Sequence, residues 1–145
     1  MDPVSSIRDV LTEVLGEPPR EITPLAGATS ALLYRIRLQR DDVVARRFLP
    51  ERWETPVAEL SEREYAILEA LAASSLPTPQ PITLLPGNGL VMSFLPGSVW
   101  LPRTPVAAWV EEMAALLSRI HSCGITVPHH YRSWNDARGK PAPEW

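Results

Sequence analysis

Residues 25–48 read LAGATSALLYRIRLQRDDVVARRF, and this stretch decides the fold of the chain. Apolar side chains alternate with arginines over Tyr34–Leu38, which is the period of two expected for a half-buried strand. A turn is expected at Gln39–Asp42, and the chain then returns as a second strand over Val43–Phe48. The stretch therefore predicts a hairpin of two antiparallel strands.

Two adjacent arginines lie on the returning strand. Because successive side chains of a strand point to opposite faces, Arg46 shares its face with Val44 and Phe48, whereas Arg47 points the other way. Arg46 is therefore the arginine that we expect among these apolar neighbours. A charge in such a place needs an anionic partner.

The segment before the hairpin, Gly27, Ala28, Thr29 and Ser30, can form an anion-binding loop. Glycine permits backbone conformations that are closed to other residues, and the small side chains after it let a ligand approach main-chain N–H groups. Two hydroxyl groups add further donors. The alternative is an ordinary hairpin turn, which such a run forms more often.

Composition limits the classes of function. The chain has 145 residues, of which 45% are hydrophobic, and a net charge of only −3, which argues against a nucleic-acid surface. No apolar run approaches the roughly 18 residues of a membrane span, and the first residues do not resemble a signal peptide. The single cysteine, Cys123, cannot form an internal disulfide. We expect a cytoplasmic protein without a membrane partner.

Further elements are predicted before the hairpin. Apolar spacing over Ile7–Leu15 predicts an amphipathic helix, with Gly16 as its stop. Residues 21–26 predict a short first strand, and Pro24 within it favours a position at the edge of a sheet.

The next predicted helix follows the hairpin, with Thr55 as its N-cap. Glu64 falls on the apolar stripe of this helix and therefore needs a partner. Two more strands are expected at residues 82–85 and 90–95, joined by the glycine-rich turn 86–89.

A last helix is predicted from Pro105, with Thr104 as its cap, to near Gly124. The sequence thus predicts five short strands with one inserted helix, which form a small antiparallel sheet covered on one side. This is an α+β arrangement. Arg46 on the third strand and Glu64 on the following helix are then placed to meet. The alternative function for such a pair is a salt bridge that only fixes the helix on the sheet.

The order of these segments resembles the N-terminal lobe of the aminoglycoside phosphotransferase family, a kinase-like group. The similarity covers roughly residues 21–122, and the segments that carry it are LAGATSALLYRIR, VVARRF, SEREYAILEAL, LPTPQPITL, GLVMSFLPG and MAALLSRIH. The resemblance implies a protein-kinase-like N-lobe, followed by the first helix of an incomplete C-lobe. The three predicted parts are residues 1–19 with the first helix, 20–97 with the nucleotide-binding lobe and hinge, and 98–145 with the start of the second lobe.

The resemblance also implies the site residues. Gly27–Ser30 would be the loop over the nucleotide phosphates. Arg46 stands where kinase-like proteins have the lysine that contacts the α and β phosphates, and Glu64 where a helix carboxylate orients it. Arginine in place of lysine departs from the kinase pattern. The planar guanidinium of arginine differs in reach and hydrogen-bonding geometry from the compact ammonium group of lysine.

The resemblance further implies that the segment Ser93-Phe94-Leu95-Pro96-Gly97 is the hinge between the lobes, and that the backbone of Ser93, Phe94 and Leu95 pairs with adenine. ATP with Mg²⁺ is therefore the expected cofactor. The intact enzyme would transfer the ATP γ-phosphate to a hydroxyl group of a small substrate. Its catalytic loop resembles His-Gly-Asp-x-x-x-x-Asn, which is not found in this sequence. We therefore expect a truncated chain that is inactive by itself, with its metal ligands in the missing lobe and the helix of Pro105–Cys123 partly bare.

Two other functions remain open at the level of the sequence. The chain can be a non-catalytic kinase-like module that binds a nucleotide or a partner, or an interaction domain in which Gly27–Ser30 is only a turn. A zinc site at His121, Cys123, His129 and His130 fits no closed tetrahedral pattern.

Overall fold

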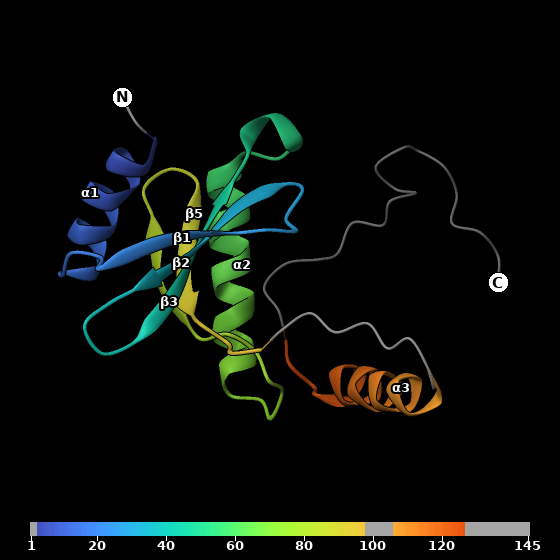
Figure 1. The fold of residues 1–145 in the computed structure, drawn as a ribbon. Coiled ribbons are helices and arrows are strands. Elements are labelled where there is room, and N and C mark those ends of the chain that lie inside the picture. Colours follow the sequence, from blue (N-terminus) through green and yellow to red (C-terminus); the bar gives the residue numbers. More distant parts are fainter. Residues whose placement is uncertain (1–2, 98–105, 127–145) are drawn as a thin grey trace.

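The computed structural model describes residues 3–97 and 106–126. Its elements form a five-stranded sheet with helices packed on it, while α3 stands to one side (Figure 1). In chain order the elements are α1 (Pro3–Leu15), β1 (Glu21–Leu25), β2 (Ala31–Arg37), β3 (Asp42–Phe48), the 3-10 turn η1 (Pro50–Arg52), α2 (Val57–Ala72), β4 (Pro81–Leu85), β5 (Gly89–Ser93) and α3 (Ala107–Ser122).

The sheet is antiparallel throughout, with the strand order β1-β2-β3-β5-β4. The predicted hairpin is confirmed as β2 and β3, which pair from Ala31 opposite Phe48 to Arg37 opposite Asp42. β1, which contains Pro24, lies at the edge of the sheet as predicted. The α+β class and the five-stranded antiparallel sheet are therefore confirmed.

Both faces of the sheet are covered by helices. On the face that α1 covers, here the α1 face, the buried cluster consists of Ile7, Leu11, Ile36, Val43, Ala45, Leu85 and Val91. On the face that α2 covers, here the α2 face, the buried cluster consists of Ala31, Phe48, Leu68 and Leu90. The expectation of a sheet covered on one side was therefore wrong. Apolar side chains point to both sides of β3, so each face needs a helix over it.

Two boundaries differ from the predicted ones. α2 begins at Val57, so its N-cap is Pro56 instead of Thr55, and no side chain caps its first turn. β5 ends at Ser93, two residues before the predicted end at Leu95. The chain therefore leaves the sheet directly after Ser93, and the predicted hinge begins at the last residue of the strand.

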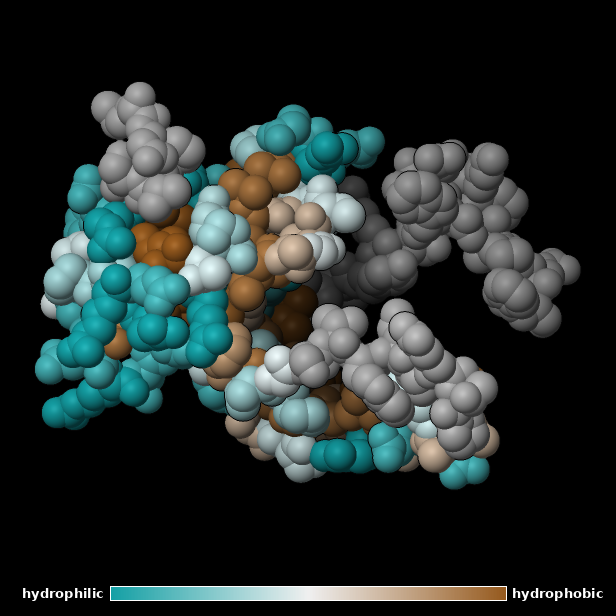
Figure 2. Space-filling model, in the orientation of Figure 1, coloured by the Kyte–Doolittle hydropathy of each residue, from teal (hydrophilic) through white to brown (hydrophobic). Residues whose placement is uncertain are grey.

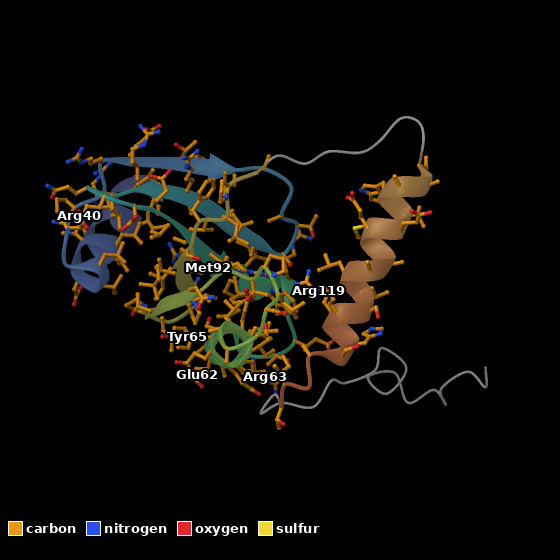
Figure 3. The ribbon with its side chains drawn as sticks, turned by 90° about the horizontal axis from the view of Figure 1, so that it is seen from below. Arg40, Glu62, Arg63, Tyr65, Met92 and Arg119 are labelled. Atoms are coloured by element: carbon orange, nitrogen blue, oxygen red, sulfur yellow. The ribbon has the colours of Figure 1, made fainter. Side chains whose placement is uncertain are left out.

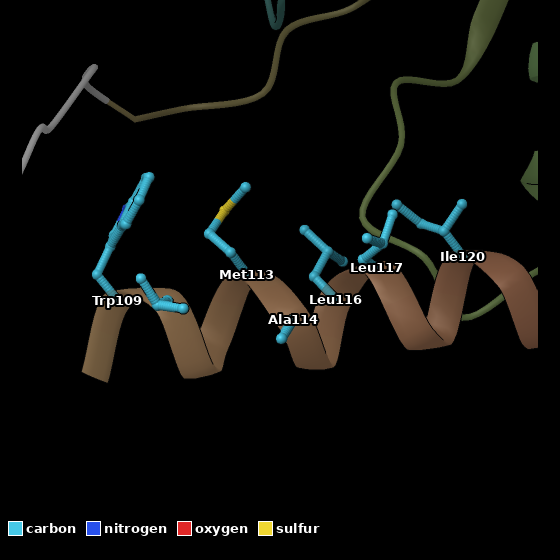
Figure 4. Close-up of a pocket in the computed structure, with 7 residues that line it drawn as sticks. Trp109, Met113, Ala114, Leu116, Leu117 and Ile120 are labelled. Carbon is cyan, nitrogen blue, oxygen red and sulfur yellow. The ribbon is translucent and has the colours of Figure 1, made fainter. Parts of the chain in front are cut away.

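α3 carries an exposed apolar face. Trp109, Met113, Leu117 and Ile120 rise from one side of the helix (Figure 4) and line a shallow hollow, and Figure 2 shows hydrophobic surface over this helix. The exposed fractions of Met113 and Leu117 are 49% and 52%, which confirms the expectation of a bare stripe within the described residues.

The start of α3 lies later than predicted. The helix begins at Ala107 and not at Pro105, and the expected cap, Thr104, lies outside the described residues. Arg119 reaches from α3 toward the segment after α2 (Figure 3), where it donates a hydrogen bond of 2.6 Å to the Ser75 carbonyl.

Within the described ranges, no helix is long and apolar enough to cross a membrane.

Candidate functional site

An ion pair joins the sheet to α2. Arg46 projects from β3 on the α2 face, and its Nη1 donates to Glu64 Oε1 of α2 over 2.9 Å. The guanidinium also lies 4.8 Å from the centre of the Phe48 ring, which is a cation–π contact. The side chains of Arg46 and Glu64 are only 29% and 24% exposed. The predicted meeting of these two residues is confirmed.

Burial governs the ionisation of Glu64. Removal from water raises the pKa of this carboxyl above its ordinary value of 4.5, and the attraction and hydrogen bond of Arg46 offset this rise only in part. The carboxylate is therefore held in a place where its charge is costly. Such a pair is weak support for stability by itself and is more typical of a site that needs an oriented charge.

Arg46 keeps most of its hydrogen-bonding capacity. A guanidinium has five N–H groups, and within the described residues its one hydrogen bond goes from Nη1 to Glu64. Arg46 Nε is buried and has no acceptor among these residues. The side chain is thus oriented by Glu64 and still has N–H groups with which to bind an anion.

The loop between β1 and β2 has the features of an anion cradle. Gly27 has φ +102°, a conformation that other residues rarely adopt, and a Cβ added there would meet no atom within 4 Å. Within the described residues, no hydrogen bond uses the backbone N–H of Gly27, Ala28 or Thr29, and all three residues are exposed. These N–H groups are therefore available to an acceptor from outside the described residues.

An apolar strip, which consists of Val44 and Met92, lies next to Arg46 on the α2 face. The strand register places Arg46 opposite Leu33, and Val44 opposite Met92. Val44 is buried, and Met92 points from β5 toward α2 (Figure 3), where it packs on the buried cluster of that face. Because alternate residues of a strand are about 7 Å apart, Val44 lies one such step from Arg46 toward the hinge.

A second charged pair, Arg35 and Asp42, lies at the hinge end of the strip. Arg35 Nε donates to Asp42 Oδ2 over 2.7 Å, and the Arg35 guanidinium lies 4.3 Å from the centre of the Phe94 ring. The Phe94 N–H also donates to the Asp42 carbonyl over 3.4 Å. The first hinge residue after β5 is therefore anchored to the β2–β3 hairpin.

The hinge residues differ in which backbone groups they leave free. The Ser93 N–H donates to the Gln80 carbonyl over 2.8 Å, and the Phe94 N–H is taken by Asp42. In the described part of the chain, no hydrogen bond uses the N–H of Leu95. Of Ser93, Phe94 and Leu95, Leu95 is therefore the one whose N–H remains available to a ligand.

Gly89 is a residue whose importance the sequence alone does not reveal. The glycine-rich turn predicts the β4–β5 hairpin, but the reason for glycine at 89 is the close approach of β5 to β3. A Cβ added there would lie 2.1 Å from the Arg46 carbonyl oxygen. Glycine therefore lets β5 pack directly beside the residue that carries the guanidinium.

The sequence pattern of the phosphotransferase enzyme family matches residues 21–145, which is most of the chain. The chain belongs to the phosphotransferase enzyme family. No curated protein matches the chain.

Solved structures confirm the kinase-like lobe. A protein provisionally assigned as an aminoglycoside phosphotransferase, from Ralstonia eutropha JMP134, matches with a TM-score of 0.54 and 22% identity over 81% of this chain and 37% of its own. A protein provisionally assigned as a fructosamine-3-kinase, from Thermobifida fusca YX-ER1, matches with a TM-score of 0.52 and 22% identity over 79% of this chain and 38% of its own. The chain thus spans less than two fifths of the length of the structures it matches, and at this identity the likeness concerns the fold.

In this member of the phosphotransferase enzyme family, the predicted site residues fall along one face of the sheet. Arg46 and Glu64 are in contact, the Gly27–Ser30 loop lies at one end of the face, and the hinge lies at the other. No hydrogen bond or ion pair joins the loop directly to Arg46 within the described residues. The described ranges hold no group of three His, Cys, Asp or Glu residues that could bind a metal ion, and His129 and His130 lie outside them.

Proposed function

We propose that this chain is the nucleotide-binding lobe of a small-molecule phosphotransferase and that it binds ATP on the α2 face. The observation that carries the proposal is Arg46, which is oriented by Glu64 on the same face as an apolar strip and has N–H groups to spare. Adenine would lie over Val44 and Met92, with the Leu95 N–H as its backbone donor. The phosphates would lie over Arg46 and the Gly27–Ser30 loop.

The order of groups along β3 supports this placement. Passing from the hinge end to the loop end of the α2 face, β3 presents Asp42, Val44, Arg46 and Phe48 at alternate positions. An apolar base followed by a polyanionic chain matches an apolar side chain followed by a guanidinium and then by free N–H groups. Mg²⁺ would arrive with the nucleotide and neutralise its phosphates.

The whole enzyme, in this proposal, transfers the ATP γ-phosphate to a hydroxyl group of a small substrate. The present sequence contains no His-Gly-Asp segment, which in kinase-like enzymes supplies the residue that accepts the hydroxyl proton. We therefore expect this chain to bind nucleotide without transferring phosphate.

A thermal melt with and without Mg·ATP tests the proposal. A ligand that binds only the folded state raises the melting temperature, so we expect an increase for the wild-type chain. Arg46→Ala should lose this increase. Arg47→Ala is a matched control, because the neighbouring arginine lies on the α1 face, where its Nε donates to Asn88 Oδ1 over 3.3 Å. A cooperative wild-type melt without any increase, or an equal increase in Arg46→Ala, would overturn the proposal.

A further inference from the structure

Trp53 holds the end of the Gly27–Ser30 loop. Its indole Nε1–H donates to the Ser30 carbonyl over 3.0 Å, and the Leu49 N–H donates to the same oxygen over 3.2 Å. These two bonds tie the last residue of the loop to the chain that follows β3. Trp53 is itself placed by the 3-10 turn η1, where its N–H donates to the Pro50 carbonyl over 3.2 Å.

The indole ring also connects the loop with Arg46. It contacts the Phe48 ring edge to face, at 5.8 Å between centres and 85° between planes. Phe48 is 3% exposed, and the Arg46 guanidinium lies against the same Phe48 ring. Because the buried Phe48 cannot move freely, the Ser30 carbonyl and the Arg46 guanidinium are both held relative to one rigid side chain.

The loop needs such a hold because its own residues give it little. Ala26, Gly27, Ala28 and Thr29 are all exposed. A ligand that must order a mobile loop loses binding free energy, whereas a loop already held in position does not impose this cost. A single indole N–H can therefore influence affinity for the part of a ligand that lies over the loop.

We propose that Trp53 is a positioning residue for the phosphate groups of the nucleotide. Its N–H fixes the Ser30 carbonyl, and through it the free N–H groups of the loop, at a set place relative to Arg46. This inference rests on the proposed nucleotide site. The indole N–H favours ligands with phosphate groups and leaves the binding of the base unchanged.

The test uses Trp53→Phe in the full chain. Phenylalanine keeps an aromatic ring beside Phe48 and removes the N–H, and Trp53 is 38% exposed, so the variant is expected to fold with a cooperative melt. Binding of Mg·ATP and of adenosine is measured by calorimetry for each protein. The loss of one hydrogen bond predicts an affinity for Mg·ATP about threefold to tenfold lower, with the affinity for adenosine unchanged.

Amide hydrogen exchange without nucleotide gives a second readout. The Leu49 N–H, which donates to the same Ser30 carbonyl as the indole, should exchange faster in Trp53→Phe than in the wild type. Trp109→Phe, which makes the same substitution on α3, is the matched control and should change neither the exchange of the Leu49 N–H nor the affinity for either ligand.

The outcomes separate the two proposals. If the wild type prefers Mg·ATP to adenosine and Trp53→Phe keeps the full preference, or if the exchange of the Leu49 N–H is unchanged, the role of Trp53 is overturned and the nucleotide site stands. If the wild type does not bind Mg·ATP, the nucleotide site is overturned, and the role of Trp53 falls with it. A loss of adenosine binding equal to the loss of Mg·ATP binding would show a general disturbance and would also overturn the role of Trp53.

Discussion

The two faces of the sheet are built from the same strands but differ in what they hold. The α1 face is an apolar core in which Leu11, Ile36, Ala45 and Val91 are fully buried. The α2 face has a smaller buried cluster and carries the half-buried Arg46–Glu64 pair beside it. The α1 face therefore buries more apolar side chains, whereas the α2 face combines a smaller apolar cluster with a charged pair.

The adjacent arginines of β3 sharpen this contrast. Arg46 lies on the α2 face with a carboxylate partner, whereas Arg47 on the α1 face interacts with the neutral side chain of Asn88. The two residues are consecutive, and the alternation of side chains along the strand places them on opposite faces. Their partners come from different elements: Glu64 belongs to α2, and Asn88 belongs to the turn between β4 and β5.

The largest effect is expected in the α1 face. Leu11→Ala should lower the free energy of unfolding by about 2–5 kcal/mol, because Leu11 is 0% exposed and its removal leaves a cavity between α1 and the sheet. Urea denaturation measures the change. Leu32→Ala is the control: this residue is 43% exposed, and its truncation should cost about 1 kcal/mol or less. Equal losses for the two variants would contradict a closed core under α1.

A smaller loss is expected when the ion pair of the α2 face is broken. Glu64→Ala leaves the half-buried Arg46 guanidinium without its acceptor, and we expect a loss of about 1–3 kcal/mol. Glu62→Ala on the same helix is the control. Glu62 is exposed and forms no ion pair within the described residues, so a change within about 0.5 kcal/mol is expected in urea denaturation. If Glu64→Ala left the free energy of unfolding unchanged, the Arg46 guanidinium would already be well hydrated.

The pH dependence of stability should show the cost of burying Glu64. Its pKa is raised by folding, so the folded chain binds a proton more readily than the unfolded chain between pH 4.5 and the raised value. The free energy of unfolding of the wild type should therefore rise as the pH falls through this range, relative to Glu64→Gln. Urea denaturation of both proteins from pH 4 to 7 measures the difference. A difference that grows with rising pH would show instead that the attraction of Arg46 outweighs burial.

The smallest effect is expected at the rim of the sheet. Arg37 and Glu21 form an ion pair of 2.8 Å, but their side chains are 54% and 51% exposed. Exposed pairs contribute little, so Arg37→Ala should change the free energy of unfolding by about 0.5 kcal/mol or less. Arg35, two residues earlier on the same face, is the informative contrast because it also lies against Phe94. A large loss in Arg37→Ala would mean that the edge strand β1 depends on this pair.

The sequence predicts this fold where the signal is local. Alternation of apolar residues and arginines is enough to place the β2–β3 hairpin, and side-chain parity is enough to assign Arg46 to the face of Val44 and Phe48. Glu64 could be found because a carboxylate on an apolar stripe needs a partner. These inferences depend on spacing within single elements.

The sequence does not predict features that depend on contacts between residues far apart in the chain. The second covering helix, α1, could not be assigned to a face, because an amphipathic helix shows only that it has an apolar side. Gly89 looks like a turn residue until β5 is seen beside the Arg46 carbonyl. Trp53 follows a loop, and only the folded chain brings its indole to Ser30, 23 residues earlier.

The alternation of side chains along β3 also determines which changes of chain length the protein can accept. Residues added to the exposed turn at 39–41 leave the pairing of both strands unaltered. Deletion of Val44 would instead exchange the faces of all later residues in the strand. Arg47 would then take the place opposite α2, and Arg46 would be forced into the dry core where Ala45 now lies. Single-residue deletions within β3 should therefore be lost by selection for folding, even though an arginine would still face the carboxylate.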